Sequence, residues 1–85
     1  MSAAEEQAVY ARLAEIFRDV FGRADITLHP GLTAGDVVGW DSFRHVEIVL
    51  ALEDHYAIRI STRELERVFT LGDLVALVLG KTASP

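Results

Sequence analysis

The 85-residue chain contains no cysteine, so no disulfide can stabilise its fold and no side-chain thiol can act as a nucleophile or a metal ligand. It has no apolar run of membrane-spanning length. Its first residues have neither the basic start nor the apolar core of a signal peptide. From the last two absences we expect a cytoplasmic protein that does not enter a membrane. Because the chain starts at a methionine and ends just past its last expected helix, we also expect it to be freestanding.

Basic residues are also scarce: the chain has eight basic and thirteen acidic residues, which gives a net charge of -5. This balance disfavours binding to nucleic acid or anionic lipid, because both carry negative charge, and it suits partners with basic surfaces. The hydrophobic fraction of 51% is typical of a globular chain. The length predicts one domain that spans residues 1–85.

Patterns that support catalysis or metal binding are missing as well. His45 and His55 are ten residues apart, whereas two metal ligands on one helix face need a spacing of three or four. Nothing in the sequence brings an imidazole and an acid to a serine, and the glycines lack the lysine of a phosphate-binding loop. We therefore predict a non-catalytic protein with no catalytic residue and no metal site.

Apolar residues that recur every three or four positions predict an all-α fold. The expected helices cover residues 3–21, 42–56, 62–69 and 71–79, separated first by a long glycine-containing loop over 22–41. Ser61 with Glu64 and Thr70 with Asp73 provide capping residues for the last two helices. The sequence thus predicts a small four-helix bundle of three longer helices and a short third one.

The helix expected at 42–56 has two apolar stripes. One fits burial in a core and contains His45, Ile48, Val49, Leu52 and Tyr56. The other contains Phe43, Val46 and Leu50. A helix that is apolar on both sides either packs against two neighbours or leaves one stripe exposed for a partner, and periodicity alone favours two neighbours.

The start of this helix is the point of greatest chemical interest. Asp41 is a good helix cap, which makes Ser42 the first helical residue and leaves its hydroxyl open. A helix N-terminus stabilises an anion such as a phosphodiester, because its N–H groups are unpaired and carry partial positive charge. An Asp-Ser pair alone is nevertheless most often a plain cap.

The stretch from Trp40 to Glu53 resembles the acyl carrier protein family, whose signature is Asp-Ser-Leu at the start of a helix that continues with Val-Glu, aliphatic residues and Leu-Glu. The resemblance covers residues 2–79. It implies that Ser42 carries a covalent 4′-phosphopantetheine cofactor, whose thiol holds acyl groups as thioesters. It further implies that Asp41 assists the transferase that adds the group. A long first loop belongs to this family, with Ile26, Leu28, Leu32, Val37 and Val38 as its expected apolar anchors here.

The family resemblance also implies partners and a docking surface. The partners are a phosphopantetheinyl transferase, an acyl-loading ligase or acyltransferase, and a ketosynthase or other acyl-transfer enzyme. The exposed side of the second helix would bind them, and a monomer suits such serial presentation. The expected contact residues are Phe43, Val46, Glu47, Leu50, Glu53 and Asp54. For Glu53 and Asp54 an ordinary solvated helix face explains the sequence equally well.

Three departures from the fatty-acid-synthesis pattern follow Ser42: Phe43 replaces leucine, Arg44 replaces an acidic residue, and His45 replaces a small polar one. They favour a specialised pathway, polyketide-like or otherwise secondary. Two alternatives remain open. A peptidyl or aminoacyl carrier would share the arm and the serine, although Gly39-Trp40-Asp41 lacks the usual small-residue approach. An unmodified helical adaptor would use Asp41 and Ser42 only as a cap.

Overall fold

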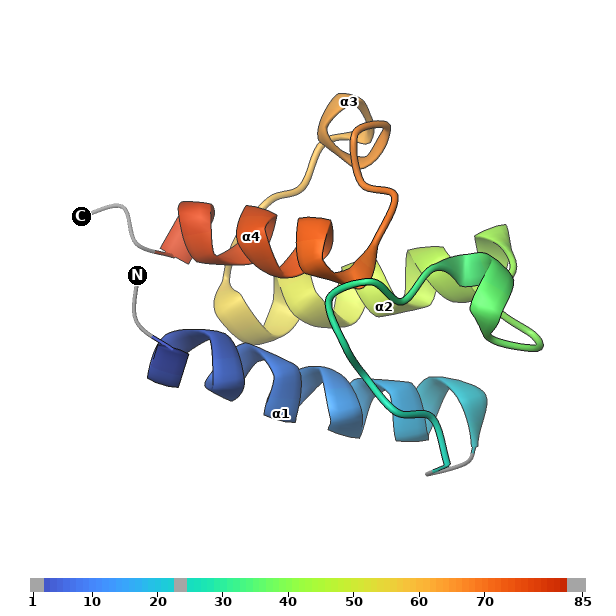
Figure 1. Cartoon of the computed structure of the whole chain (residues 1–85). Helices are drawn as coiled ribbons and strands as arrows, with labels where there is room; N and C mark the ends of the chain where they lie inside the picture. The colour runs from blue at the N-terminus through green and yellow to red at the C-terminus, as the bar shows by residue number, and fades with distance from the viewer. Residues whose placement is uncertain (1–2, 23–24, 83–85) are drawn as a thin grey trace.

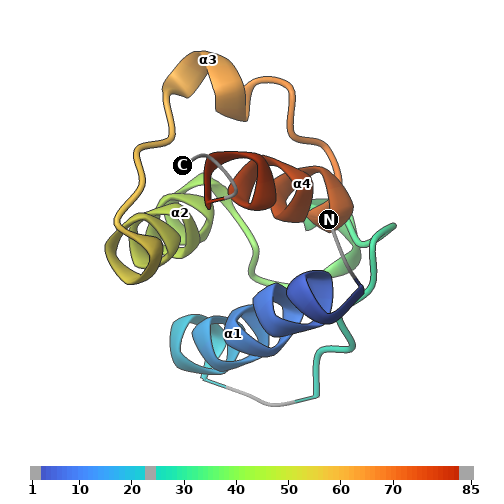
Figure 2. The ribbon, with the colours of Figure 1, turned by 90° about the vertical axis from the view of Figure 1, so that its left-hand side faces the viewer.

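The computed structural model describes residues 3–22 and 25–82, which form four α-helices, a 3-10 turn and no strand. The elements are α1 (Ala3–Phe21), η1 (Ala34–Asp36), α2 (Ser42–Tyr56), α3 (Thr62–Leu65) and α4 (Leu71–Thr82). Figures 1 and 2 show α1, α2 and α4 side by side, with the short α3 on the side of the bundle opposite α1. The all-helical bundle expected from the sequence is confirmed.

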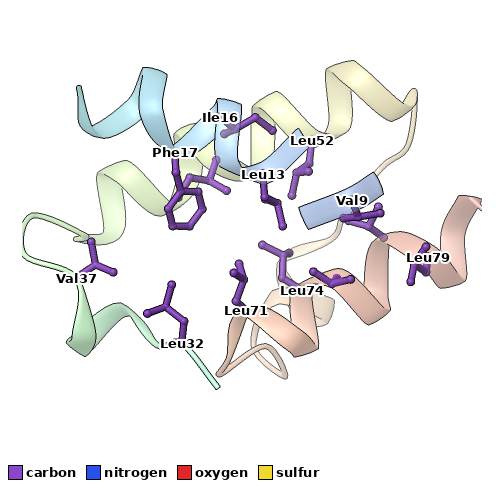
Figure 3. Packing of buried hydrophobic residues seen from close by; sticks show 13 residues of the cluster. Val9, Leu13, Ile16, Phe17, Leu32, Val37, Leu52, Leu71, Leu74 and Leu79 are labelled. Carbon is purple, nitrogen blue, oxygen red and sulfur yellow. The ribbon is translucent and has the colours of Figure 1, made fainter. Parts of the chain in front are cut away.

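The core lies between α1, α2 and α4, and α1 contacts both of the other long helices. Each of these three helices buries an apolar stripe of its sequence, because residues three or four apart share one face. Leu13, Phe17, Leu52 and Leu74 are almost fully buried and converge in the centre of the bundle (Figure 3). Burial of each such side chain contributes on the order of 1.5–3 kcal/mol to folding.

The connection between α1 and α2 packs on the bundle through some of its expected anchors. Leu32 and Val37 are buried in the core, and Ile26 and Leu28 are partly buried against it (Figure 3). The prediction for Val38 is wrong, because its side chain is 84% exposed. The backbone at Val37 is extended, so consecutive side chains point to opposite sides, and the burial of Val37 turns Val38 outward.

This connection also satisfies the start of α4. The first N–H groups of a helix have no partner within the helix. Here the backbone N–H of Leu71 donates to the carbonyl oxygen of Leu32 at 2.8 Å, and that of Gly72 donates to Pro30 at 2.9 Å. The two backbones come so close that a Cβ on Gly72 would lie 3.0 Å from the Pro30 carbonyl oxygen. The loop is therefore held against α4 by main-chain contacts.

The third helix is shorter than the expected 62–69. A capping box starts α3, with the Ser61 hydroxyl and the Glu64 carboxylate each accepting the other residue's backbone N–H. The helix ends at Leu65, and the chain then continues to the start of α4 through turns in which Arg67 and Val68 donate their N–H groups to carbonyl oxygens three residues back. There the Asp73 carboxylate accepts the backbone N–H groups of Phe69 and Thr70 at 3.0 and 3.1 Å.

The last helix continues beyond the expected end at residue 79. Glycine often ends a helix in a left-handed conformation, but the backbone of Gly80 does not adopt a positive φ and α4 runs to Thr82. The additional residues bring the Lys81 amine to 2.8 Å from a Glu64 carboxylate oxygen. This ion pair fastens the short α3 to the end of α4.

Candidate functional site

The approach to Ser42 is a tight turn anchored on α1. Gly39 has a φ of +91°, which favours glycine, and Asp41 donates its N–H to the Gly39 carbonyl at 3.1 Å. The turn brings the Trp40 ring edge-on against Phe17, with centroids 5.2 Å apart. A second edge contact joins Trp40 to Phe21 at 6.3 Å. The residue before the Asp-Ser pair is therefore fixed on the core.

Asp41 caps α2 in the way the sequence predicts. Its backbone is extended, and its Oδ1 accepts the backbone N–H of Arg44 at 2.9 Å. Ser42 is the first residue of α2, and its side chain is exposed. The N–H groups of Ser42 and Phe43 have no acceptor among the described residues. An anionic ester on the Ser42 hydroxyl would thus meet the positive end of the helix dipole.

Arg44 adds a positive charge within the first turn of α2. Its Nη1 lies 2.7 Å from Glu47 Oε1, and its guanidinium lies 5.9 Å from the centre of the Phe43 ring. Both partners of the ion pair are more than one third exposed, so its contribution to stability is about 0–1 kcal/mol. The pair also offsets the negative charge of the Glu47 carboxylate near the start of α2.

Two adjoining hollows beside Ser42 form what we call the Ser42 cleft. The larger is an open groove of about 430 Å³, lined by Ala34, Trp40, Asp41, Ser42, His45 and Val46. The smaller is a cavity of about 60 Å³ that shares Ala34, Trp40 and His45 with the groove. Residues 68–71 and Leu74 form its far wall. The cleft thus leads from the serine toward the connection between α3 and α4.

The two rings shared by these hollows have unusual surroundings. His45 stacks on Trp40 with centroids 6.0 Å apart and an angle of 26° between the planes. Partial burial lowers the pKa of His45, which favours the neutral imidazole. The Trp40 Nε1 is buried and has no hydrogen-bond partner among the described residues. A buried donor without an acceptor costs about 1–3 kcal/mol.

The second stripe of α2 is exposed, which decides between the two possibilities left by periodicity. The exposed fractions are 70% for Phe43, 52% for Val46 and 57% for Leu50. No helix among the described residues covers them, whereas Ile48 and Leu52 on the other stripe are fully buried. The exposed apolar stripe begins next to Ser42 and runs along α2.

Glu53 has a structural contact that sequence reasoning missed. Its Oε2 accepts the backbone N–H of Ile60 at 2.7 Å and so holds the connector after α2. The two residues are seven positions apart, which is neither a capping nor a helical spacing, so no local sequence pattern predicts the contact. Asp54 is exposed and Glu47 is paired with Arg44. Of the three expected acidic contact residues, only Asp54 lacks such a contact within the described part of the chain.

Other features of the described residues point to no competing site. No group of three or more His, Cys, Asp or Glu side chains among them could hold a metal ion. No described helix is both long enough and apolar enough to cross a bilayer. A hollow of about 400 Å³ lies at the other end of α2 beside Asp54 and Arg59. This hollow and the groove at Ser42 are similar in volume, so the Ser42 cleft differs from it in the residues that line it and not in size.

Comparison with known proteins gives a family match. A family model described as "Phosphopantetheine attachment site" matches residues 11–78. The meromycolate extension acyl carrier protein of Mycolicibacterium aurum is 36% identical over 76 residues, covering 89% of this chain and 78% of that protein. The acyl carrier protein of Acidothermus cellulolyticus is 30% identical over 82 residues, covering 96% and 98%.

Solved structures of acyl carrier proteins have the same fold as this chain. The solution structure of a holo acyl carrier protein from Geobacter metallireducens superposes with a TM-score of 0.81 at 38% identity, covering 86% of this chain and 84% of that one. The crystal structure of an acyl carrier protein from Thermotoga maritima gives a TM-score of 0.84 at 25% identity, covering 98% and 96%.

Proposed function

Because the chain belongs to the acyl carrier protein family, we propose that Ser42 is its attachment residue and that α2 presents the attached cargo to partner enzymes. Members of this family are non-catalytic carriers with a covalent 4′-phosphopantetheine, and this chain is one of them. They work with a phosphopantetheinyl transferase and with biosynthetic enzymes.

The observation that carries the proposal is the position of the Ser42 hydroxyl. It is exposed on the first residue of α2, directly after the Asp41 cap and the anchored Trp40. The unpaired N–H groups of the first turn favour a phosphodiester there. These residues fit the group: Ser42 would bind it covalently, and the helix terminus would balance its charge.

Attachment at Ser42 is a balanced group transfer. The Ser42 oxygen forms a bond to the phosphorus next to pantetheine in coenzyme A, while the anhydride bond to the adenosine bisphosphate breaks. The hydroxyl proton passes to a base on the transferase. The group then supplies a thiol for thioester formation, a function that no side chain here provides because the chain has no cysteine.

The exposed stripe of α2 is the docking surface in this proposal. Phe43, Val46 and Leu50 offer apolar contacts beside the attachment point, and a large exposed aromatic can serve as an anchor. Asp54 and the Arg44–Glu47 pair add polar contacts at its border. Glu53 takes part mainly by fixing the end of α2, because its carboxylate is engaged with Ile60.

We further propose that the cargo belongs to a specialised pathway, polyketide-like or otherwise secondary. Arg44 supports this, because it reduces the negative potential that a partner would meet beside Ser42. The M. aurum relative is named as a carrier for meromycolate extension. Purified enzymes of general fatty acid synthesis should then accept the loaded chain less efficiently than their own carrier, and equal efficiency would contradict this.

Intact mass measurement tests the attachment. The pure protein is weighed before and after incubation with coenzyme A and a broad-specificity phosphopantetheinyl transferase. Wild type is expected to gain one phosphopantetheine and Ser42→Ala none. Ser61→Ala is the matched control, because Ser61 is also exposed at a helix start, and it should gain the full mass. A gain on Ser42→Ala would reject Ser42 and place the group on another residue. No gain on a wild type that starts unmodified would favour an unmodified adaptor.

A further inference from the structure

The segment after α2 carries positive charge in a chain that is acidic overall. Three arginines and two glutamates lie within residues 57–69, whereas the net charge of the whole chain is -5. Arg59, Arg63 and Arg67 are exposed and form no ion pair with another described residue. One of the two glutamates, Glu64, lies 2.8 Å from the amine of Lys81, which offsets its charge. The three arginines therefore outweigh the carboxylates around them.

An exposed aromatic ring lies at the end of this segment. The side chain of Phe69 is 75% exposed, but its backbone is held in place, because its N–H donates to Asp73 at 3.0 Å. Figures 1 and 2 show that α3 and its connections project from the bundle on the side away from α1. Aromatic rings and arginines often supply the binding energy of protein interfaces. We call Arg59, Arg63, Arg67 and Phe69 the α3 surface.

The α3 surface adjoins the proposed docking stripe of α2. Arg59 lines the hollow of about 400 Å³ together with Leu50, the last residue of that stripe. At the other end of the segment, Phe69 lines the small cavity of the Ser42 cleft. An enzyme that docks on α2 therefore has the α3 surface within reach.

Local charge decides what such a surface binds. At physiological salt the Debye length is about 8 Å, so an approaching group responds mainly to the charges nearest to it. Arginine pairs with a carboxylate through two parallel hydrogen bonds. A nucleic acid or an anionic membrane would present a much larger negative surface, which the acidic remainder of the chain would repel. An acidic patch of limited size on a protein fits the α3 surface better.

We propose that the α3 surface docks a partner enzyme whose contact site combines an apolar pocket for Phe69 with carboxylates that pair with the three arginines. The inference rests on the proposed carrier function, which supplies the identity of the partner as an enzyme. The contact has the opposite sign to the one that the net charge of the chain favours. Enzymes that present basic groups at this place would be repelled, so the α3 surface would select among partners.

Nuclear magnetic resonance of the full chain tests the proposal. The probe is a short peptide with a central pair of leucines flanked by runs of glutamate, and the backbone N–H signals of the protein are followed. We expect the largest shifts within residues 59–69 and their loss at high salt. Shifts that are absent, or that spread evenly over the chain, would overturn the proposal. Tighter binding of a DNA duplex or of phosphatidylserine vesicles at these residues would also overturn it, because the surface would then serve phosphate groups.

Variants separate the α3 surface from general electrostatic attraction. Arg63→Ala combined with Arg67→Ala should raise the dissociation constant of the peptide at least about fivefold. Arg18→Ala is the matched control: Arg18 is also exposed and forms no ion pair with a described residue, but it lies on α1, so its loss should leave peptide binding unchanged. Phe69→Ala should weaken binding of this peptide but not of a peptide of glutamate alone. Equal binding by the double variant and by wild type would contradict the proposal.

The titration also separates this inference from the attachment on which the proposed function depends. The α3 surface consists of protein side chains alone, so the peptide can be added to unmodified protein and to protein whose modification is verified by intact mass. Failure of attachment at Ser42 would appear in the mass, and failure of the α3 surface would appear in the titration.

Discussion

Trp40 meets Phe17 at an angle of 85°, with ring centroids 5.2 Å apart, and this contact fixes the residues before Ser42 on α1. Phe17 is only 1% exposed. Phe17→Ala should therefore lower the free energy of unfolding by about 3–5 kcal/mol, since it removes buried apolar surface and leaves a cavity. Urea denaturation followed by circular dichroism measures the change.

The matched control for that measurement is Phe43→Ala. Phe43 is the same residue type at 70% exposure, so its loss should change stability by no more than about 0.5 kcal/mol. Docking to a partner enzyme should weaken instead. Equal destabilisation by the two substitutions would contradict the burial described for Phe17.

Gly72→Ala should destabilise the protein even though alanine is the better helix former. Its new Cβ would approach the Pro30 carbonyl oxygen to 3.0 Å and push the loop from α4, at a cost of about 1–3 kcal/mol. Gly80→Ala in the same helix has no atom within 4 Å of the new Cβ, and should stabilise by up to about 1 kcal/mol. Thermal unfolding of both variants checks the opposite signs.

Glu53→Ala and Asp54→Ala compare an acidic residue that holds the backbone with one that only faces solvent. Loss of the Glu53 carboxylate leaves the Ile60 N–H without its acceptor and should cost about 1–3 kcal/mol. Asp54 is exposed, so its substitution should cost no more than about 0.5 kcal/mol. Chemical denaturation of the pair decides the matter, and similar losses would argue against a special role for Glu53.

The contact between α3 and α4 predicts acid sensitivity. Hydrogen bonds from Lys81 and from the Ser61 N–H lower the pKa of Glu64 from 4.5 to about 2. Between these values the unfolded chain binds more protons than the folded one, so the stabilisation is complete above pH 4.5 and is lost as the pH falls toward 2. Glu64→Gln should flatten this part of the stability profile, as should Lys81→Met to a smaller extent. If the stability of Glu64→Gln fell with pH as steeply as that of wild type, Glu64 would not be the group responsible for the acid sensitivity.

Features set by neighbouring residues could be predicted from the sequence. The cap at Asp41 and the boxes at Ser61–Glu64 and Thr70–Asp73 all have the three-residue spacing that a first helical turn imposes. The apolar stripes gave the fold class because burial follows periodicity. Exposure of the Phe43 stripe did not follow from periodicity, and only the family resemblance indicated it.

Contacts between distant segments could not be predicted. The role of Glu53 depends on where the connector places Ile60, and the need for glycine at position 72 depends on the path of Pro30. In a helix over 62–69 the Phe69 N–H would donate to the carbonyl four residues back, but it donates to the Asp73 carboxylate in the cap of α4. The unpaired Trp40 Nε1 is likewise a product of packing between α1, the loop and α2.

The backbone hydrogen bonds from Leu71 and Gly72 to Leu32 and Pro30 have a consequence for biosynthesis. A nascent chain that still lacks α4 has no partner for this part of the loop, although Ser42 has already been synthesised. Pairing over such sequence separations is a late event, because chain closure must come first. The carrier should therefore become a good transferase substrate only once its last helix has left the ribosome.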